Sequence, residues 1–120
     1  MKIAVSSTGK DLDSNVDPRF GRAAFFLIVD PQSMDFEVVE NVQHHNLPQG
    51  AGIQAAQTVA AERVDTVITG NCGPKAFRML QAAGVQIVTG AKGRIAEIIH
   101  QYRQGELETA DKANVSGHWA

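Results

Sequence analysis

The chain has 120 residues and a formal net charge of −2, which argues against broad electrostatic attraction to nucleic acid or to a membrane surface. Its single cysteine excludes an internal disulfide and a cysteine-only metal site within one chain. Hydrophobic residues make up 43%, with few aromatics, as is typical of one α/β domain. No apolar run approaches the ~20 residues that span a bilayer, and the sequence opens on a strand rather than a signal peptide, so we expect a cytoplasmic protein.

The first third of the sequence predicts three strands. Residues 2–7 form a short apolar run that indicates a strand in the middle of a sheet, and the glycine and aspartates of residues 8–18 indicate a loop. Residues 25–30 and 35–42 predict two further strands. Because only a short turn separates these two, we expect a hairpin and therefore antiparallel pairing.

Helices and short strands alternate in the middle of the chain. A helix is predicted over about residues 52–63, with alanines on its buried face that let it lie close to the sheet. Residues 66–69 predict the fourth strand. Pro74 suits the first position of a second helix, and Gly84 is the residue expected to end it.

The last predicted elements complete the fold class. Residues 85–89 predict a fifth strand, and a third helix follows whose apolar residues have clear helical spacing: Ile95, Ile98, Ile99 and Tyr102. This order predicts an α/β fold, a three-layer α/β/α sandwich around a five-stranded mixed sheet with one antiparallel strand. We expect one domain over residues 1–107 and a polar, mobile tail over residues 108–120.

Three glycine-bearing turns, at residues 6–9, 70–75 and 90–94, follow predicted strands. In an open α/β sheet the carboxyl ends of parallel strands lie along one edge, where ligands bind. Glycine lets the backbone approach a guest, and the amides at a helix start favour anions. We therefore predict a pocket for a small, bulky, negatively charged guest, with these contacts: Ser7, Gly9, Asn71, Gly73, Lys75, Lys92 and Arg94.

Cys72 and two histidines are the candidate metal ligands. Cys72 precedes the predicted second helix, where amides and Lys75 would stabilise a thiolate; the alternative is a small buried residue in a tight turn. His44 and His45 are candidates because imidazole suits copper, iron, zinc or molybdenum clusters. Both can reach one metal only if their loop bends, and a solvated loop is the alternative.

Residues 50–55 match the G-x-G-x-x-A dinucleotide fingerprint letter for letter. The motif follows a polar loop rather than a strand, and no ribose-binding acid follows about 20 residues later, so we do not expect a nucleotide site. A helix start at Gly50 and Gly52 that can receive an anion remains. Arg22 can bind an oxyanion through its guanidinium or pair with a surface carboxylate. No nucleophile or acid–base pair stands out, so we expect no enzyme.

Three motifs occur in a fixed order. Phe20-Gly21-Arg22-Ala23 precedes a strand, Gly50-Ala51-Gly52 opens an alanine-rich helix, and Gly70-x-x-Gly73-Pro74-Lys75-Ala76 follows a Val-Ile strand. Together they resemble the dinitrogenase iron–molybdenum cofactor-binding family over about residues 2–107. The resemblance implies a ribonuclease-H-like fold that holds or carries metal–sulfur clusters. A bare single domain is similar to the stand-alone members, one of which holds a sulfide-bridged molybdenum–copper cluster without covalent attachment.

The resemblance implies a carrier of a molybdenum–copper sulfide cluster, or of the iron–molybdenum cofactor or a precursor. Cys72 and one of His44 or His45 would contact the cluster, and the glycine turns would provide amides. The alternative is a regulatory protein–protein interaction module of the same fold with no bound metal. We expect a monomer or weak homodimer, compatible with a protein partner in a larger complex, and neither nucleic acid nor membrane as a partner.

Overall fold

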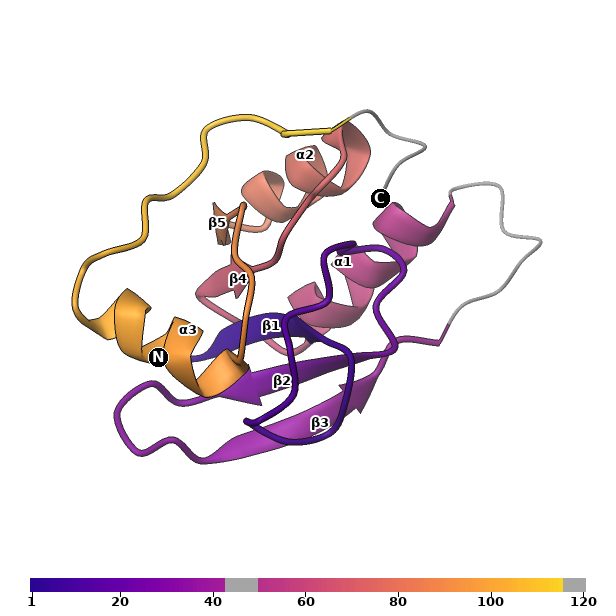
Figure 1. The fold of residues 1–120 in the computed structure, drawn as a ribbon. Helices are drawn as coiled ribbons and strands as arrows, with labels where there is room; N and C mark the ends of the chain where they lie inside the picture. Colours follow the sequence, from indigo (N-terminus) through magenta and orange to yellow (C-terminus); the bar gives the residue numbers. More distant parts are fainter. Residues whose placement is uncertain (43–49, 116–120) are drawn as a thin grey trace.

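The computed structural model describes residues 1–42 and 50–115 (Figure 1). Its elements are β1 (Ile3–Ser7), β2 (Phe25–Val29), β3 (Phe36–Glu40), α1 (Ala51–Ala61), β4 (Thr66–Ile68), α2 (Pro74–Ala82), β5 (Gln86–Val88) and α3 (Ile95–Arg103). This order confirms the predicted one, and the bounds differ from the predicted ranges by only a few residues. Within the described residues, no helix is both long and apolar enough to cross a membrane.

The five strands form one mixed sheet in the order β3-β2-β1-β4-β5. β1, β4 and β5 are parallel, and β2 is antiparallel to both of its neighbours. The short connection between β2 and β3 makes a tight turn in which Met34 takes a left-handed conformation and its amide donates to the carbonyl of Asp30 at 2.8 Å. The mixed sheet and its hairpin are therefore as predicted.

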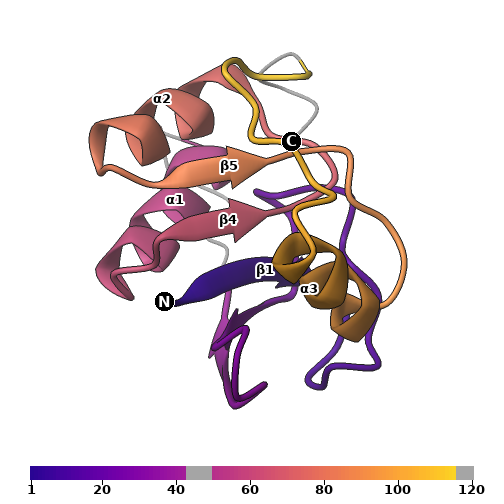
Figure 2. The same ribbon diagram turned by 90° about the vertical axis from the view of Figure 1, so that its left-hand side faces the viewer.

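Helices cover both faces of the sheet (Figures 1 and 2). α1 and α2 pack on one face, where the fully buried Ala55 and Ala56 let α1 lie close to the strands. α3 packs on the other face and buries Ile95, Ile98 and Ile99. Each face thus has its own apolar cluster, and the domain is the three-layer sandwich that the sequence predicts.

The two edges of the sheet differ. At the β5 edge the chain after α3 turns back along the domain (yellow in Figure 2), and the amide of Ala110 donates to the carbonyl of Ile87 at 2.7 Å. At the other edge, β3 leaves Phe36 and Val38 38% and 39% exposed. The mobility that we expected of the tail is not tested by these contacts, but they place its described part, residues 108–115, against the domain.

Candidate anion site at the carboxyl edge of the sheet

The topology brings the three helix starts to one edge of the sheet. β1, β4 and β5 are parallel to one another. β2 is antiparallel to both β1 and β3, so β3 runs in the same direction as β1. α1, α2 and α3 follow β3, β4 and β5, so each helix begins at this carboxyl edge. The turns 70–75 and 90–94 are in direct contact, since the amide of Gly90 donates to the carbonyl of Gly70 at 2.7 Å.

The long loop 8–24 closes the part of this edge that lies before α3. The amide of Ile95 donates to the carbonyl of Ser14 at 3.0 Å, and the amide of Ala96 donates to the carbonyl of Leu12 at 2.9 Å. The amides of the first two residues of α3 are therefore used within the domain. These two amides of the third glycine turn and its helix start are not offered to a guest, contrary to our expectation.

Ser7 and Gly9 also serve the fold. Ser7 is fully buried, and its hydroxyl donates to the carbonyl of Gly9 at 2.7 Å and accepts from the amide of Gly9 at 3.1 Å. A Cβ atom at Gly9 would overlap the hydroxyl of Ser14. Both predicted contacts are thus occupied by the turn that ends β1.

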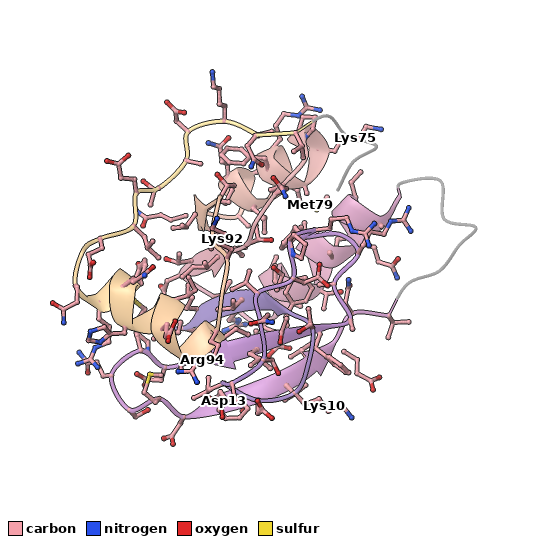
Figure 3. All side chains as sticks on the ribbon, viewed as in Figure 1. Lys10, Asp13, Lys75, Met79, Lys92 and Arg94 are labelled. Carbon is pink, nitrogen blue, oxygen red and sulfur yellow. The ribbon has the colours of Figure 1, made fainter. Side chains whose placement is uncertain are left out.

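The cations near this edge differ in their pairing. Arg94 lies 3.5 Å from Asp13 and 3.3 Å from Glu97 in two exposed ion pairs. Lys75 and Lys92 are exposed and form no ion pair within residues 1–42 and 50–115. Figure 3 shows Lys75, Lys92 and Arg94 following one another across the view. Lys75 and Lys92 therefore carry charges that no described neighbour neutralises.

The turn between β4 and α2 is held in place by the loop 8–24. The amide of Phe20 donates to the carbonyl of Asn71 at 3.1 Å, and the side-chain amide of Asn71 donates to the carbonyl of Pro18 at 2.8 Å. The side chain of Asn71, a predicted contact for the guest, is thus engaged in holding the turn. Arg22 lies in the same loop, is exposed, and has no ion pair with any described residue.

The tail closes onto the same turn through Asn114. The side-chain oxygen of Asn114 accepts a hydrogen bond from the amide of Cys72 at 2.8 Å. Its side-chain nitrogen donates to the carbonyl of Gly70 at 3.2 Å and to the side-chain oxygen of Asn71 at 3.0 Å. Asn114 could not be predicted from the sequence, because one asparagine in a polar tail belongs to no motif and reaches the turn only by tertiary folding.

Cys72 is fully buried in the apolar cluster shared with α1 and α2. Burial raises the pKa of its thiol to about 12, because a thiolate would lose its hydration there. The sequence-based expectation that amides and Lys75 stabilise the thiolate is therefore wrong. The structure agrees with the alternative of a small buried residue in a tight turn. His44 and His45 lie outside the described residues.

Within the described residues, nothing caps the starts of α1 and α2 at this edge. Neither helix has a side-chain cap or an acidic residue in its first turn. At α2 the first position is Pro74, which has no N–H, and the amides of Lys75 and Ala76 have no acceptor in the part of the chain that the structure describes. At α1 the N-cap is Gly50, whose φ of 86° is left-handed and favours glycine. Unsatisfied first-turn amides attract anions.

This donor set suits an anion rather than a bare metal ion. Among the described residues, no three or more His, Cys, Asp or Glu side chains gather where they could hold a metal ion. What the edge presents is backbone N–H groups at the start of α2 and two exposed ammonium groups, Lys75 and Lys92. Such groups donate hydrogen bonds to the outer oxygen or sulfur atoms of an anion.

Known proteins share this fold over nearly the whole chain. The apo form of the orange protein from Desulfovibrio gigas is 40% identical, with a TM-score of 0.89 over 95% of this chain and 96% of that chain. A Thermotoga structure described as belonging to the DUF35 family is 35% identical, with a TM-score of 0.77 over 97% and 98% of the two chains. An uncharacterised protein from Methanocaldococcus jannaschii is 28% identical over 112 residues, which are 90% of this chain and 94% of that protein.

The family comparison agrees with these relatives. The model of the family described as dinitrogenase iron-molybdenum cofactor matches residues 1–105. The match covers the whole sheet and all three helices, and the resemblance carried by the three sequence motifs is confirmed. The chain belongs to the dinitrogenase iron–molybdenum cofactor family.

Proposed function

We propose that this protein is a non-enzymatic carrier of an anionic metal–sulfur cluster that contains molybdenum. The observation that carries the proposal is the open start of α2, which bears Lys75, with Lys92 in the contacting turn 90–94; neither lysine has an ion pair to any described residue. Membership of a family described by the iron–molybdenum cofactor supports a metal cluster as the cargo. Similarity to the orange protein favours the molybdenum–copper sulfide cluster, with the iron–molybdenum cofactor or a precursor as the alternative.

The donor set fits such a cargo. A thiomolybdate-type cluster is a compact polyanion whose outer sulfur atoms accept hydrogen bonds from amides and ammonium groups. It can therefore be held without a cage of thiolates, which a single cysteine does not provide. Cys72 would have to leave the core to reach the cluster, so we assign it a packing role. A direct contact from His44 or His45 remains part of the proposal on sequence grounds.

Anaerobic reconstitution tests the proposal. The apo-protein is incubated with tetrathiomolybdate and copper(I), desalted, and examined for visible charge-transfer absorption and for molybdenum and copper content. We expect the wild type to retain both metals and the double variant Lys75→Gln/Lys92→Gln to retain much less. Lys2→Gln is the control for the loss of one charge and is compared with the single variants Lys75→Gln and Lys92→Gln, because Lys2 precedes β1 at the opposite end of the strand.

The outcomes separate cluster binding from the role of Cys72. A wild type that retains neither colour nor metal would reject cluster binding. Normal retention by Cys72→Ser supports the packing role, whereas loss of retention in a folded Cys72→Ser protein would restore the thiolate as a ligand. Elemental analysis of protein purified without oxygen or chelators identifies which metals it carries from the cell.

The β3 edge favours a second candidate function, a protein–protein interaction module. Phe36 and Val38 are more than a third exposed on an edge strand, and such edges are sites where another chain can pair. If the folded wild type cannot be reconstituted with either cluster, the interaction function is favoured over the carrier function.

A further inference from the structure

The tail segment 110–115 makes one polar attachment at the site proposed for the cluster, through Asn114. The side-chain oxygen of Asn114 occupies the amide of Cys72, two residues before α2 begins, at 2.8 Å. In a second hydrogen bond between the two residues, the backbone amide of Asn114 donates to the carbonyl of Cys72 at 3.3 Å. The side-chain amide of Asn114 thus occupies a backbone donor two residues before the helix start at which we place the guest.

A charged guest would compete well for this donor. The side-chain oxygen of Asn114 is a neutral acceptor, and hydrogen bonds to ionised acceptors are roughly twice as strong as those between neutral groups. The helix start favours negative charge as well. A polyanion seated at the start of α2 therefore offers the amide of Cys72 a stronger partner than Asn114 does.

The charge of the tail also favours its displacement by an anionic guest. The tail stretch 106–115 carries the acidic residues Glu106, Glu108 and Asp111 against one basic residue, Lys112. All four are exposed, and none forms an ion pair with a described residue. An anionic guest at the neighbouring turn would repel this stretch, at a range that salt shortens.

Segment 110–115 has few attachments besides Asn114, whose four hydrogen bonds all go to residues 70–72. The amide of Ala110 donates to the carbonyl of Ile87, and Ala110 and Ala113 are only partly buried against the core. Segments with few buried apolar contacts open at low free energy. Release of this segment would leave the sheet and its two apolar clusters intact.

We propose that Asn114 is an internal ligand of the turn before α2, and that the anionic cluster displaces it and thereby releases segment 110–115. This inference rests on the proposed function. It makes Asn114 a competitor of the guest, so that loading and tail release are coupled in both directions.

Two substitutions at one position test the competition. Asn114→Ala frees the amide of Cys72 and is expected to bind tetrathiomolybdate with copper(I) several-fold more tightly than the wild type. Asn114→Asp places a negative charge beside the guest and is expected to bind several-fold more weakly. Thr109→Ala is the control, because Thr109 is an exposed tail residue whose side chain forms no hydrogen bond with a described residue, and it should bind as the wild type does.

Limited proteolysis measures release of the tail independently of the affinity for the cluster. Trypsin cleaves after Lys112, which lies between the two attachments at Ala110 and Asn114. We expect slow cleavage at Lys112 in the unloaded wild type, faster cleavage when it is loaded, and fast cleavage in Asn114→Ala regardless of loading. Mass spectrometry identifies the product that ends at Lys112.

Each outcome bears on the proposal. If Asn114→Ala and Asn114→Asp both bind more weakly while remaining folded by circular dichroism, Asn114 only organises the turn and the competition is rejected. If the wild type binds the cluster but cleavage at Lys112 does not change, coupled release is rejected while the carrier function stands. If neither the wild type nor Asn114→Ala binds, the carrier function fails and this inference fails with it.

Discussion

A Cβ atom placed on Gly70 would lie 2.7 Å from the Cα atom of Pro18 and 2.8 Å from its carbonyl oxygen. The two residues belong to the turn after β4 and to the loop 8–24, which are thus in backbone contact. Because the side-chain amide of Asn71 donates to the same carbonyl of Pro18 at 2.8 Å, the contact also orients the turn that precedes α2. A side chain at position 70 would force these two segments apart.

Gly70→Ala is therefore expected to destabilise the protein by about 1–3 kcal/mol, the usual range for overpacking. The free energy of unfolding in urea measures the loss. Gly84→Asn is the control, because a Cβ atom at Gly84 meets nothing within 4 Å and asparagine tolerates its left-handed conformation. A Gly70→Ala variant as stable as the wild type would contradict the close contact with Pro18.

Ser6 and Thr69 form a buried hydrogen bond between β1 and the end of β4, with their hydroxyl oxygens 2.7 Å apart. Ser6→Ala alone leaves the Thr69 hydroxyl buried without this partner, which costs about 1–3 kcal/mol. Adding Thr69→Val removes the orphaned hydroxyl. We expect the double variant to lose less stability than the sum of the two single variants, as measured by a double-mutant cycle in urea. Additive losses would contradict the coupling.

The buried thiol of Cys72 predicts a specific pH dependence. Its pKa is about 12 in the folded protein, against 9.0 for an ordinary thiol. Between these values the unfolded chain binds fewer protons than the folded protein, so the free energy of unfolding falls as pH rises, by up to about 1.4 kcal/mol per pH unit. This contribution is fully present below pH 9 and is lost on approach to pH 12.

The comparison with Cys72→Ala isolates this effect. The difference in unfolding free energy between the wild type and Cys72→Ala should be constant from pH 7 to 8 and shift against the wild type above pH 9. Native Cys72 should also react slowly with a thiol reagent at pH 8, because only a thiolate attacks. Rapid labelling of the folded protein would contradict the burial of this thiol.

The unequal pairing of the cations predicts unequal effects on cluster retention. Lys92→Gln removes an unpaired positive charge, whereas Arg94→Gln removes one already shared with Asp13 and Glu97. Each substitution removes one positive charge, but only the charge of Lys92 is unpaired. We therefore expect Lys92→Gln to weaken tetrathiomolybdate–copper retention more than Arg94→Gln does. The difference should shrink in high salt, which screens exposed charges. A larger effect of Arg94→Gln would contradict the assignment of Lys92 as the available cation.

The site was only partly predictable from sequence. The glycine turns and Lys75 are local features, and their positions after strands indicated an anion site at one edge. The closure of the α3 start by Leu12 and Ser14 was not predictable, because backbone carbonyls of a loop carry no sequence signal. The same holds for Asn114, whose partners lie more than 40 residues away. The pKa of Cys72 was predicted in the wrong direction, because burial outweighs the nearby amides.

The sequence alone determined the order of strands and helices, the hairpin of β2 and β3, and the family. Apolar periodicity, proline and glycine are local signals, because each affects the backbone conformation of only a few neighbouring residues. Which helix start is open was decided only by the tertiary structure. The backbone amides at the starts of α2 and α3 are chemically alike. In the folded chain, carbonyls of loop 8–24 accept hydrogen bonds from amides of α3, and the side chain of Asn114 accepts one from the amide of Cys72. Satisfying backbone hydrogen bonds across distant segments is a property of the folded chain as a whole.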